Sequence, residues 1–368
     1  MVKVSLARCN DYNPDRVFAA VKKAVDLVGG MEAFVKKGAK VLIKPNLLSA
    51  RRPEDAVDTH PEVVRAVARL AKLSGAGVVL LGDSPGGYGA DMDEIFDKSG
   101  MRAVAKEEGV ELVKFTASKT VDGIPFTRYI FDCDCVISVP KLKTHLVTIL
   151  TAGIKNMYGT VVGLYKSERH LSAPKGKDFA KVIAKVYGIA KPHLTVLDAI
   201  RAMEGDGPSG GQPRNLNLVM AGPDAVAIDT IAAAIVGIEP LDVLVTKEAF
   251  RSGFGEADPA KIELAGDDAA GFFLPNFKMP QTIPLGFVPT AIATAAASLI
   301  KFKLHIDIRV CRRCRLCKTT CPVNAIEIGK DSCKIDYKKC VRCLCCHEVC
   351  PYKAIRIKRN LLTKLLWR

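Results

Sequence analysis

The stretch CVISVPKLKTH (residues 135–145) decides the fold, because an apolar run ends abruptly in a basic segment. A short run rich in Val and Ile is typical of a strand that is buried on both faces of a sheet. Pro140 ends the run, and positive charge follows it. We therefore predict a buried strand over 135–139 that opens at its carboxyl end into a functional loop at 140–145.

Similar apolar runs recur through the first 280 residues and alternate with helical patterns. One helix is predicted over 14–28 with Asn13 as its cap, and another over 60–73 behind a capping box from Thr59 to Glu62. Repeated strand–helix alternation predicts an α/β fold with a mostly parallel, doubly wound sheet. The predicted strands cover residues 2–7, 40–43, 78–81, 110–115, 135–139, 194–198, 216–220 and 261–264.

The positive charge of the chain is concentrated near its C-terminus. The whole chain of 368 residues has a formal net charge of +15. Residues 301–368 hold 18 Lys and Arg against 5 Asp and Glu, whereas the first 300 residues hold 36 against 34. This distribution indicates a local partner or counter-charge near the C-terminus.

An internal repeat explains most of the thirteen cysteines. The segment CRRCRLCKTTCPVNAIEI (311–328) matches CVRCLCCHEVCPYKAIRI (340–357) at an offset of 29 residues. Each copy has the spacing C-x2-C-x2-C-x3-C-P, in which three thiolates hold one iron–sulfur cluster and the fourth reaches the other cluster. Zinc sites more often use two C-x2-C pairs. We predict two [4Fe–4S] clusters, one on Cys311, Cys314, Cys317 and Cys350, and the other on Cys340, Cys343, Cys346 and Cys321.

Residues 307–358 resemble the bacterial-type two-cluster ferredoxins. The resemblance implies a small residue between the second and third Cys of each run, where this chain has Arg315 and Leu344. Of the remaining cysteines, Cys345 and Cys333 are interpreted as packing residues. Cys133 and Cys135 are expected on one face of a strand, where core packing is favoured over a metal site. The N-terminus lacks a secretory signal pattern, so a cytoplasmic protein with reduced or metal-bound thiols is expected.

The domain boundaries follow from these patterns. We expect an α/β domain over 1–280, an apolar linker over 281–306, the two-cluster domain over 307–358 and a basic amphipathic tail over 359–368. The uncharged segment 283–300 is interpreted as a linker helix in preference to a membrane span. The tail is either solvated or lies on a partner or an anionic membrane surface. Nucleic acid is a lesser option, because no recognition motif is present.

Polar loops after the predicted strands carry the candidate ligand site. Open α/β sheets bind ligands at the carboxyl ends of their strands. The positively charged candidates could converge there on a phosphate or carboxylate, with glycines allowing close approach of backbone N–H groups; solvated surface lysines are the alternative. They are Lys44, Lys141, Lys143, His145, Lys155 and His170. The other candidate binding residues are Asp83, Gly86, Gly87, Gly205 and Gly207.

Three residues are candidates for catalysis: His145, Lys143 and Asp229. His145 could donate a proton in a reduction, since histidine titrates near neutral pH; a loop histidine bonded to the backbone is the alternative. Lys143 would neutralise an anion. Asp229 is the sole charge in the apolar segment 225–236, so it must be functional or paired with a lysine.

The motifs of the large domain resemble the family called domain of unknown function 362. They are IKPNLL, GDSPGG, SVPKLKTH, GIKNMYG, a following Lys166 and His170, MEGDGPSGG and DAVAIDT, in that order within residues 1–270. Members of that family often carry a ferredoxin module at the C-terminus. The resemblance implies an association with iron–sulfur chemistry and no settled reaction.

These observations predict an iron–sulfur oxidoreductase. The expected partner is an acidic electron donor or acceptor protein of the ferredoxin or flavodoxin type, drawn to the basic C-terminal segment. Electrons would pass through two [4Fe–4S] clusters to an anionic substrate or cofactor at the strand ends, and a further organic cofactor is left open. A non-enzymatic electron carrier is one alternative, in which the large domain only docks a partner. A factor that assembles or matures a metalloenzyme is the other.

Overall fold

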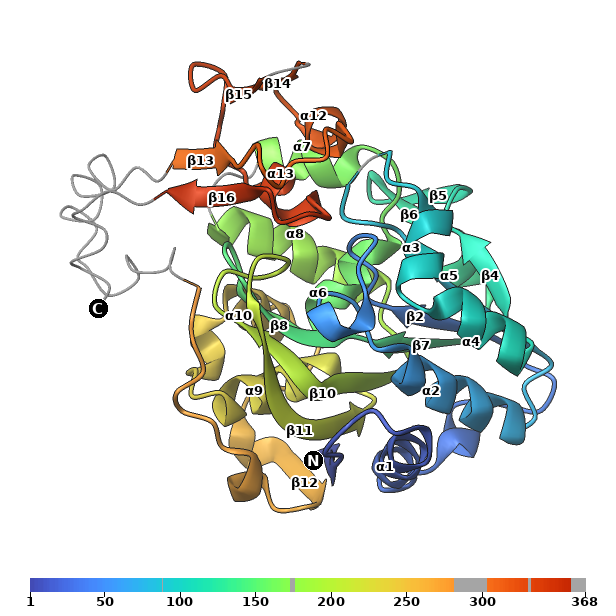
Figure 1. Cartoon of the computed structure of the whole chain (residues 1–368). Helices are drawn as coiled ribbons and strands as arrows, with labels where there is room; N and C mark the ends of the chain where they lie inside the picture. The colour runs from blue at the N-terminus through green and yellow to red at the C-terminus, as the bar shows by residue number, and fades with distance from the viewer. Residues whose placement is uncertain (88, 173–175, 281–302, 330–331, 359–368) are drawn as a thin grey trace.

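The computed structural model describes residues 1–87, 89–172, 176–280, 303–329 and 332–358. The chain forms a large α/β part and a small C-terminal module that lies against one edge of it (Figure 1). The predicted linker segment 281–302 and tail 359–368 lie outside the described residues. No helix among the described residues is long and apolar enough to cross a membrane.

A ten-stranded sheet forms the centre of the α/β part, in the order β12-β1-β11-β10-β7-β2-β3-β4, with β8 and β9 attached beside β10. Parallel pairs predominate, and β11 runs antiparallel to both β1 and β10. The mostly parallel α/β prediction is therefore confirmed. The strands are β1 (Val2–Arg8), β2 (Lys40–Pro45), β3 (Val78–Asp83), β4 (Glu111–Lys114), β7 (Cys135–Val139), β8 (Lys141–His145), β9 (Ile149–Thr151), β10 (Leu194–Glu204), β11 (Gln212–Gly222) and β12 (Ile262–Gly266).

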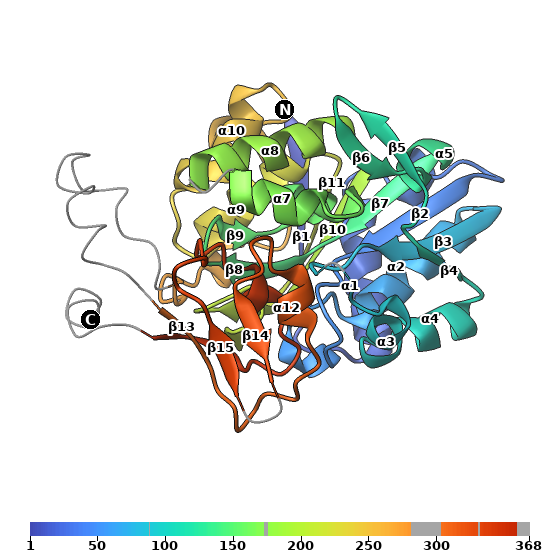
Figure 2. The same ribbon diagram turned by 90° about the horizontal axis from the view of Figure 1, so that it is seen from above.

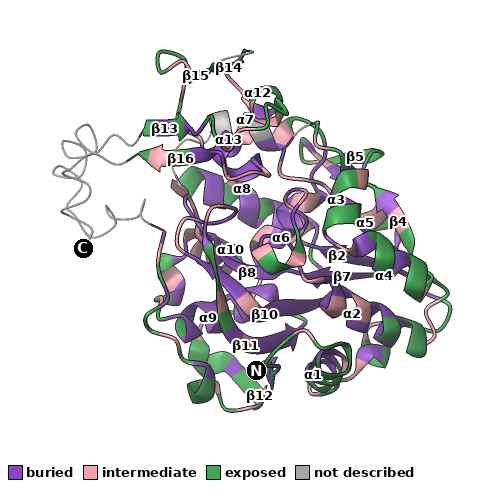
Figure 3. Ribbon diagram, in the orientation of Figure 1, coloured by how far each residue is buried: buried purple, intermediate pink, exposed green. Residues whose placement is uncertain are grey.

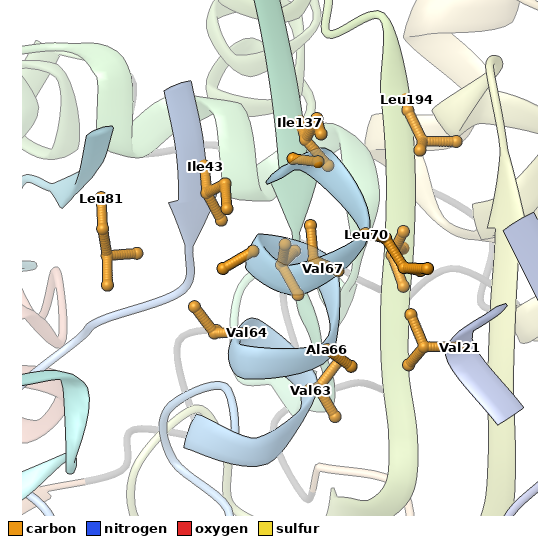
Figure 4. Close-up of a cluster of buried hydrophobic side chains, with 14 of the residues drawn as sticks. Val21, Ile43, Val63, Val64, Ala66, Val67, Leu70, Leu81, Ile137 and Leu194 are labelled. Carbon is orange, nitrogen blue, oxygen red and sulfur yellow. The ribbon is translucent and has the colours of Figure 1, made fainter. Parts of the chain in front are cut away.

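Helices cover both faces of the sheet because successive strand side chains point to opposite sides. On β2, Val41 and Ile43 join one hydrophobic cluster, whereas Leu42 joins a second cluster on the other face. The first face packs against α1 (Pro14–Asp26), α2 (Pro61–Leu73), α3 (Met92–Lys98) and α4 (Met101–Glu108), as Figure 4 shows for α2. The second face packs against α6 (Gly153–Asn156), α8 (Gly176–Ile189), α9 (Ala225–Ile235) and α10 (Leu244–Arg251).

The inner strands of the sheet are mostly buried, whereas exposed residues gather on the outer faces of the helices and on the edge strands β4 and β12 (Figure 3). A short hairpin of β5 (Ser118–Val121) and β6 (Ile124–Thr127), the turn α5 (Tyr129–Asp132) and the helix α7 (Tyr165–Ser172) complete the α/β part. All eight predicted strands lie in the central sheet.

Three local predictions are wrong. Residues 141–145 are the buried strand β8 and not a loop, because they pair with β10 and β9. The predicted strand 194–198 is too short, since β10 continues to Glu204. His60 and not Thr59 caps α2. The Thr59 hydroxyl instead donates to the carbonyl oxygen of Val139 at 2.6 Å and ties the end of β7 in place.

The C-terminal module consists of two small sheets and two short helices. Strand β13 (Lys303–Ile306), which the sequence assigns to the linker, pairs with β16 (Ile355–Lys358) and so belongs to the module. Strands β14 (Ile326–Ile328) and β15 (Cys333–Ile335) form the second pair. Seen from above, the module lies over the ends of the central strands, with α12 (Leu316–Thr320) nearest the α3 side (Figure 2).

Candidate functional site

The sequence repeat of the C-terminal module is also a repeat of the backbone. Helix α13 (Cys345–Val349) lies 29 residues after α12. Non-glycine residues with positive φ are uncommon, so recurrence at equivalent positions marks two copies of one chain path. These residues form the pairs Arg313 and Arg342, Arg315 and Leu344, and Asn324 and Lys353. A left-handed backbone at Arg315 and Leu344 explains why a small residue is usual there.

Each predicted cysteine quartet lines a hollow of its own. The lining of the first hollow includes Cys311, Cys314, Cys317 and Cys350. The lining of the second includes Cys321, Cys340, Cys343 and Cys346. The fourth cysteine of each run thus reaches the hollow of the other run, which is the exchange that two [4Fe–4S] clusters require.

Backbone N–H groups point at the sulfurs of both quartets. Ala325 N–H lies 3.3 Å from the sulfur of Cys321, and Ala354 N–H lies 3.4 Å from that of Cys350. Burial raises the pKa of Cys317 to about 12, so this thiol would need a bound cation to become a thiolate at neutral pH. Among the described residues no three His, Cys, Asp or Glu side chains converge on a single-ion position. Four cysteines around each hollow are the donor set that a [4Fe–4S] cluster takes.

The remaining cysteines lie in different surroundings. Cys345 is buried and lines the second hollow. The sulfur of Cys333 lies 3.9 Å from that of Cys311. Cys135 and Cys133 are both buried, but in clusters on opposite faces of the sheet. The prediction that they share one face is wrong, because Cys133 precedes β7 and caps the turn α5.

The C-terminal module packs tightly against loops that leave the central strands. At Gly87, after β3, an added Cβ would lie 2.8 Å from Cγ1 of Val349 and 2.9 Å from Oγ1 of Thr320. The Ser209 hydroxyl donates to the carbonyl oxygen of His347 at 3.0 Å. Arg51 donates to the carbonyl oxygen of Cys350 at 3.3 Å. The module therefore covers part of the edge where α/β proteins bind ligands.

Lys44 forms a buried ion pair and is not free to bind a ligand. Its Nζ lies 2.7 Å from the Oδ1 of Asp83, and both side chains are buried. Nζ also donates to Asn156 Oδ1 at 3.1 Å. Burial lowers the pKa of Lys44 and raises that of Asp83, while each charge opposes the shift of the other. Gly159 lies directly over the pair, since an added Cβ would be 2.3 Å from Asp83 Oδ1.

Lys141 is held in the same way. Its Nζ lies 2.7 Å from the Oδ2 of Asp198 and donates to the hydroxyl of Tyr12 at 2.8 Å. The Tyr12 hydroxyl lies 2.9 Å from the other carboxylate oxygen of Asp198. The His60 ring stacks on Tyr12 with a centroid distance of 3.5 Å. This network satisfies the charge of Lys141 within the protein, as buried charges require.

Lys143 lies next to a buried carboxylate that sequence reasoning missed. Its Nζ donates to the carbonyl oxygen of Val57 at 2.6 Å. Burial lowers the pKa of Lys143 to about 7, and the charge of Asp58 opposes this shift. Burial raises the pKa of Asp58 to about 7, and the charge of Lys143 opposes that shift. The two groups therefore stabilise one another's charged forms.

His145 and Lys155 face a carboxylate of the C-terminal module. The Nε2 of His145 lies 3.3 Å from Oε1 of Glu348. The Nδ1 accepts the backbone N–H groups of Val147 and Thr148, so the ring proton is on Nε2. Burial raises the pKa of Glu348 to about 6, and the charges of Lys155 and Lys143 oppose this. Glu348 is thus an internal anion of the basic cluster.

Asp229 binds the backbone. Its Oδ1 accepts from Gly153 N–H at 2.6 Å and its Oδ2 from Ile154 N–H at 3.1 Å. These N–H groups open the short helix α6, which carries Lys155 and Asn156. Burial raises the pKa of Asp229 to about 7, against these two hydrogen bonds. These two hydrogen bonds explain why a carboxylate is buried here without a lysine partner or a ligand. The side chain of Asp229 positions α6.

An open hollow remains beside the glycine-rich loop after β3. It measures about 180 Å³, and its lining includes Gly86, Gly87, Phe115, Gly163 and Lys166. Lys166 Nζ donates to Ser84 Oγ and to the carbonyl oxygen of Pro85, both at 2.7 Å. Burial lowers the pKa of Lys166 to about 7. A second hollow lies next to the same loop, and its lining includes Cys314. Gly89 and Ala90 line both hollows.

Of the other predicted binding residues, two glycines have a role of the backbone alone, and one histidine side chain lies outside the described residues. Gly207 has no room for a Cβ, which would lie 2.1 Å from the carbonyl oxygen of Thr144. Gly205 adopts a left-handed φ of 80° and donates its N–H to the carbonyl oxygen of Lys278. The side chain of His170 lies outside the described residues. The structure therefore brings Lys143, His145 and Lys155 together and separates Lys44 and Lys141 into their own pairs.

Comparison with known proteins agrees with the motifs of the large domain. The family model of domain of unknown function (DUF362) matches residues 41–234, more than half of the chain. The chain belongs to this family. The matched region of this DUF362 protein includes β2 to α9, and with them the ion pairs of Lys44 and Lys141 and the cap made by Asp229. It ends before the C-terminal module begins.

A curated relative extends the similarity along most of the DUF362 chain. The thylakoid-associated protein sll1697 of Synechocystis sp. is 32% identical over 296 residues, which cover 78% of this chain and 91% of the relative. Two solved structures are similar at 14% identity each. A Thermotoga maritima protein gives a TM-score of 0.38 over 66% of this chain and 60% of its own. The lactate racemase apoprotein of Thermoanaerobacterium thermosaccharolyticum gives 0.35 over 61% and 54%.

The residues that sequence reasoning missed are the partners of the lysines. Asp58 and Tyr12 lie in segments whose pattern gave them no special role. Asn156 lies in the motif GIKNMYG but was not itself a candidate. Glu348 carried a signal, because it is the sole carboxylate between Asp336 and the end of a strongly basic segment. A single acid among many bases, next to cluster ligands, predicts a specific contact.

Proposed function

We propose that this DUF362 protein is an iron–sulfur oxidoreductase in which two [4Fe–4S] clusters supply single electrons to a ligand bound beside the loop after β3. Cys311, Cys314, Cys317 and Cys350 would hold one cluster, and Cys321, Cys340, Cys343 and Cys346 the other. The observation that carries the proposal is that each quartet lines its own hollow, in a module packed on the carboxyl edge of the sheet.

The ligand site is assigned to the open hollow that contains Lys166. Lys44 and Lys141 are neutralised by Asp83 and Asp198, so they set the position of the strand ends and do not contact the ligand. Lys166 is the lysine of this hollow, and glycines form the adjoining wall. A phosphate- or carboxylate-bearing molecule suits a lysine next to closely approaching backbone. His145 faces Glu348, so we do not assign it as the proton donor to this ligand.

The test starts from protein purified and reduced without oxygen. The visible absorbance of the clusters is followed while panels of phosphate- and carboxylate-bearing metabolites are added. The proposal expects one class to reoxidise the clusters repeatedly, and Lys166→Met to lose this response while keeping its iron. Lys177→Met, at an exposed position of α8, serves as the control and should respond like the wild type.

A non-enzymatic electron carrier is the second candidate. The observation that favours it is that Lys44, Lys141 and the Lys143 group all face internal carboxylates. In that case no metabolite panel would reoxidise the clusters, whereas a redox protein would do so at an unchanged rate in the Lys166→Met variant.

A further inference from the structure

The two cysteine runs of the C-terminal module differ in exposure. Cys314, which lines the first hollow, is exposed. Its counterpart 29 residues later, Cys343, lines the second hollow and is half-buried, and every residue of α13 is buried. The three cysteines that the first run supplies to the first hollow are therefore more exposed, as a group, than the three that the second run supplies to the second hollow. An electron arriving from outside would enter at the first hollow.

Three positive charges of the first run have no positive counterpart in the second. We call Arg312, Arg315 and Lys318 the basic rim; all three are exposed, and the first two line the first hollow. Their counterparts 29 residues later are Val341, Leu344 and His347. Because both copies have the same chain path, these charges are not needed to build the module. Their presence on one copy requires another explanation.

None of the three rim side chains forms an ion pair in the described part of the chain. The nearby Asp307 lies 3.1 Å from Arg309 and 3.6 Å from Arg356, and neither of these belongs to the rim. Leu316 and Tyr352 line the same hollow as Arg312 and Arg315. Apolar groups together with charged, solvated residues are usual in a protein interface.

We propose that the basic rim is the docking surface for an acidic electron-transfer protein that reduces the first cluster. This inference rests on the proposed function. The partner's redox centre would lose one electron and the first cluster would gain it, with no bond made or broken. Acidic side chains around the partner's centre would pair with Arg312, Arg315 and Lys318, which brings that centre toward Cys314. Opposite charge raises the association rate, and salt weakens this effect.

The test uses the whole protein and an acidic [2Fe–2S] ferredoxin as the probe. Binding is measured by calorimetry, and cluster reduction by stopped-flow absorbance, at low and high ionic strength. For Arg312→Glu/Arg315→Glu we expect the association rate constant at low salt to fall by about 10-fold or more. Arg312→Gln/Arg315→Gln should fall less and in the same direction. Lys36→Glu/Lys37→Glu, exposed before β2 at the opposite edge of the sheet, should behave like the wild type.

The outcomes separate this inference from the function on which it rests. If the wild-type protein carries no clusters, the proposed function is contradicted. Binding of ferredoxin to the basic rim can still be measured on that protein, so the docking surface is tested separately. The variants are first checked for their iron content and for clusters that dithionite can reduce. If such variants bind ferredoxin and accept its electrons as the wild type does, the proposed docking surface is wrong. Tighter, rim-dependent binding to duplex DNA or to anionic vesicles than to ferredoxin would also overturn it.

Discussion

Glu348 of the C-terminal module lies 3.3 Å from the Nε2 of His145 at the end of β8. This contact joins the last cysteine run to the basic strand end of the α/β part. Glu348 also lies in the field of Lys155 and Lys143, whose positive charges oppose the burial-driven rise of its pKa. The positive charge at this strand end is therefore matched by the protein's own C-terminal module.

Replacing Glu348 by Gln should destabilise the folded protein by roughly 1–3 kcal/mol, because buried basic groups would lose their counter-charge. The free energy of unfolding in urea, measured on the cluster-loaded protein, checks this. Glu327→Gln is the matched control, since Glu327 is an exposed carboxylate of the same module. Equal stability of the two variants would show that the His145 contact contributes nothing.

Gly87→Ala should loosen the module from the α/β part. The added methyl group would lie within 3.1 Å of Val349 and Thr320, so one side must move. Hydrogen exchange should become faster in α12 and α13 and remain unchanged in α1. Gly176→Ala, where the nearest contacts are at an ordinary 3.4 Å, should show no such change. Unchanged protection of α12 and α13 in Gly87→Ala would contradict the tight contact.

The Lys44–Asp83 pair should show strong coupling in a double-mutant cycle. Lys44→Met or Asp83→Asn alone leaves one buried charge without a partner, and each should cost about 3–5 kcal/mol. The double variant should cost less than the sum, because no unpaired charge remains. Unfolding in urea measures all three. Additive losses would mean that the two side chains act independently, against the 2.7 Å distance between them.

Asp229 predicts a pH dependence of stability. Its pKa is raised by burial from 3.8 to about 7, so between these values the folded state binds more protons than the unfolded state. Stability from this group is therefore largest below pH 4 and falls as the pH rises toward 7. Asp229→Asn removes this titration, so the fall between pH 5 and pH 7.5 should be smaller than in the wild type.

The control for this prediction is Asp134→Asn. Asp134 is exposed and accepts only the backbone N–H of Lys40 among the hydrogen bonds described. Thermal unfolding of the three proteins at several pH values gives the slopes. If Asp229→Asn and the wild type lose the same stability over this range, Asp229 does not carry the proton.

The sheet was predictable from sequence because its strands are apolar on both faces. Strand β8 was not, because Lys141, Lys143 and His145 resemble a solvated loop. Their burial depends on carboxylates that are distant in the sequence, such as Asp198, which lies in β10. Local patterns report a residue's own polarity, whereas burial of a lysine depends on whether the fold supplies a partner.

The grouping of eight cysteines into two quartets follows from their spacing, whereas the partners of the lysines do not. Three cysteines of each quartet come from one short segment, so the pattern is local. The lysine cluster was predicted to bind one external anion. The structure instead distributes it among Asp83, Asp198, Asp58 and Glu348, and such pairings between distant segments leave no local trace in a single sequence.

The central claim is that each cysteine quartet holds one [4Fe–4S] cluster. The most direct measurement is the iron and sulfide content, with electron paramagnetic resonance, of anaerobically reconstituted wild type, Cys314→Ala and Cys343→Ala. The account predicts two interacting clusters in the wild type, and loss of one cluster, from a different quartet, in each variant. Wild-type protein that binds zinc in place of iron, or that holds a single cluster which either variant abolishes, would contradict it.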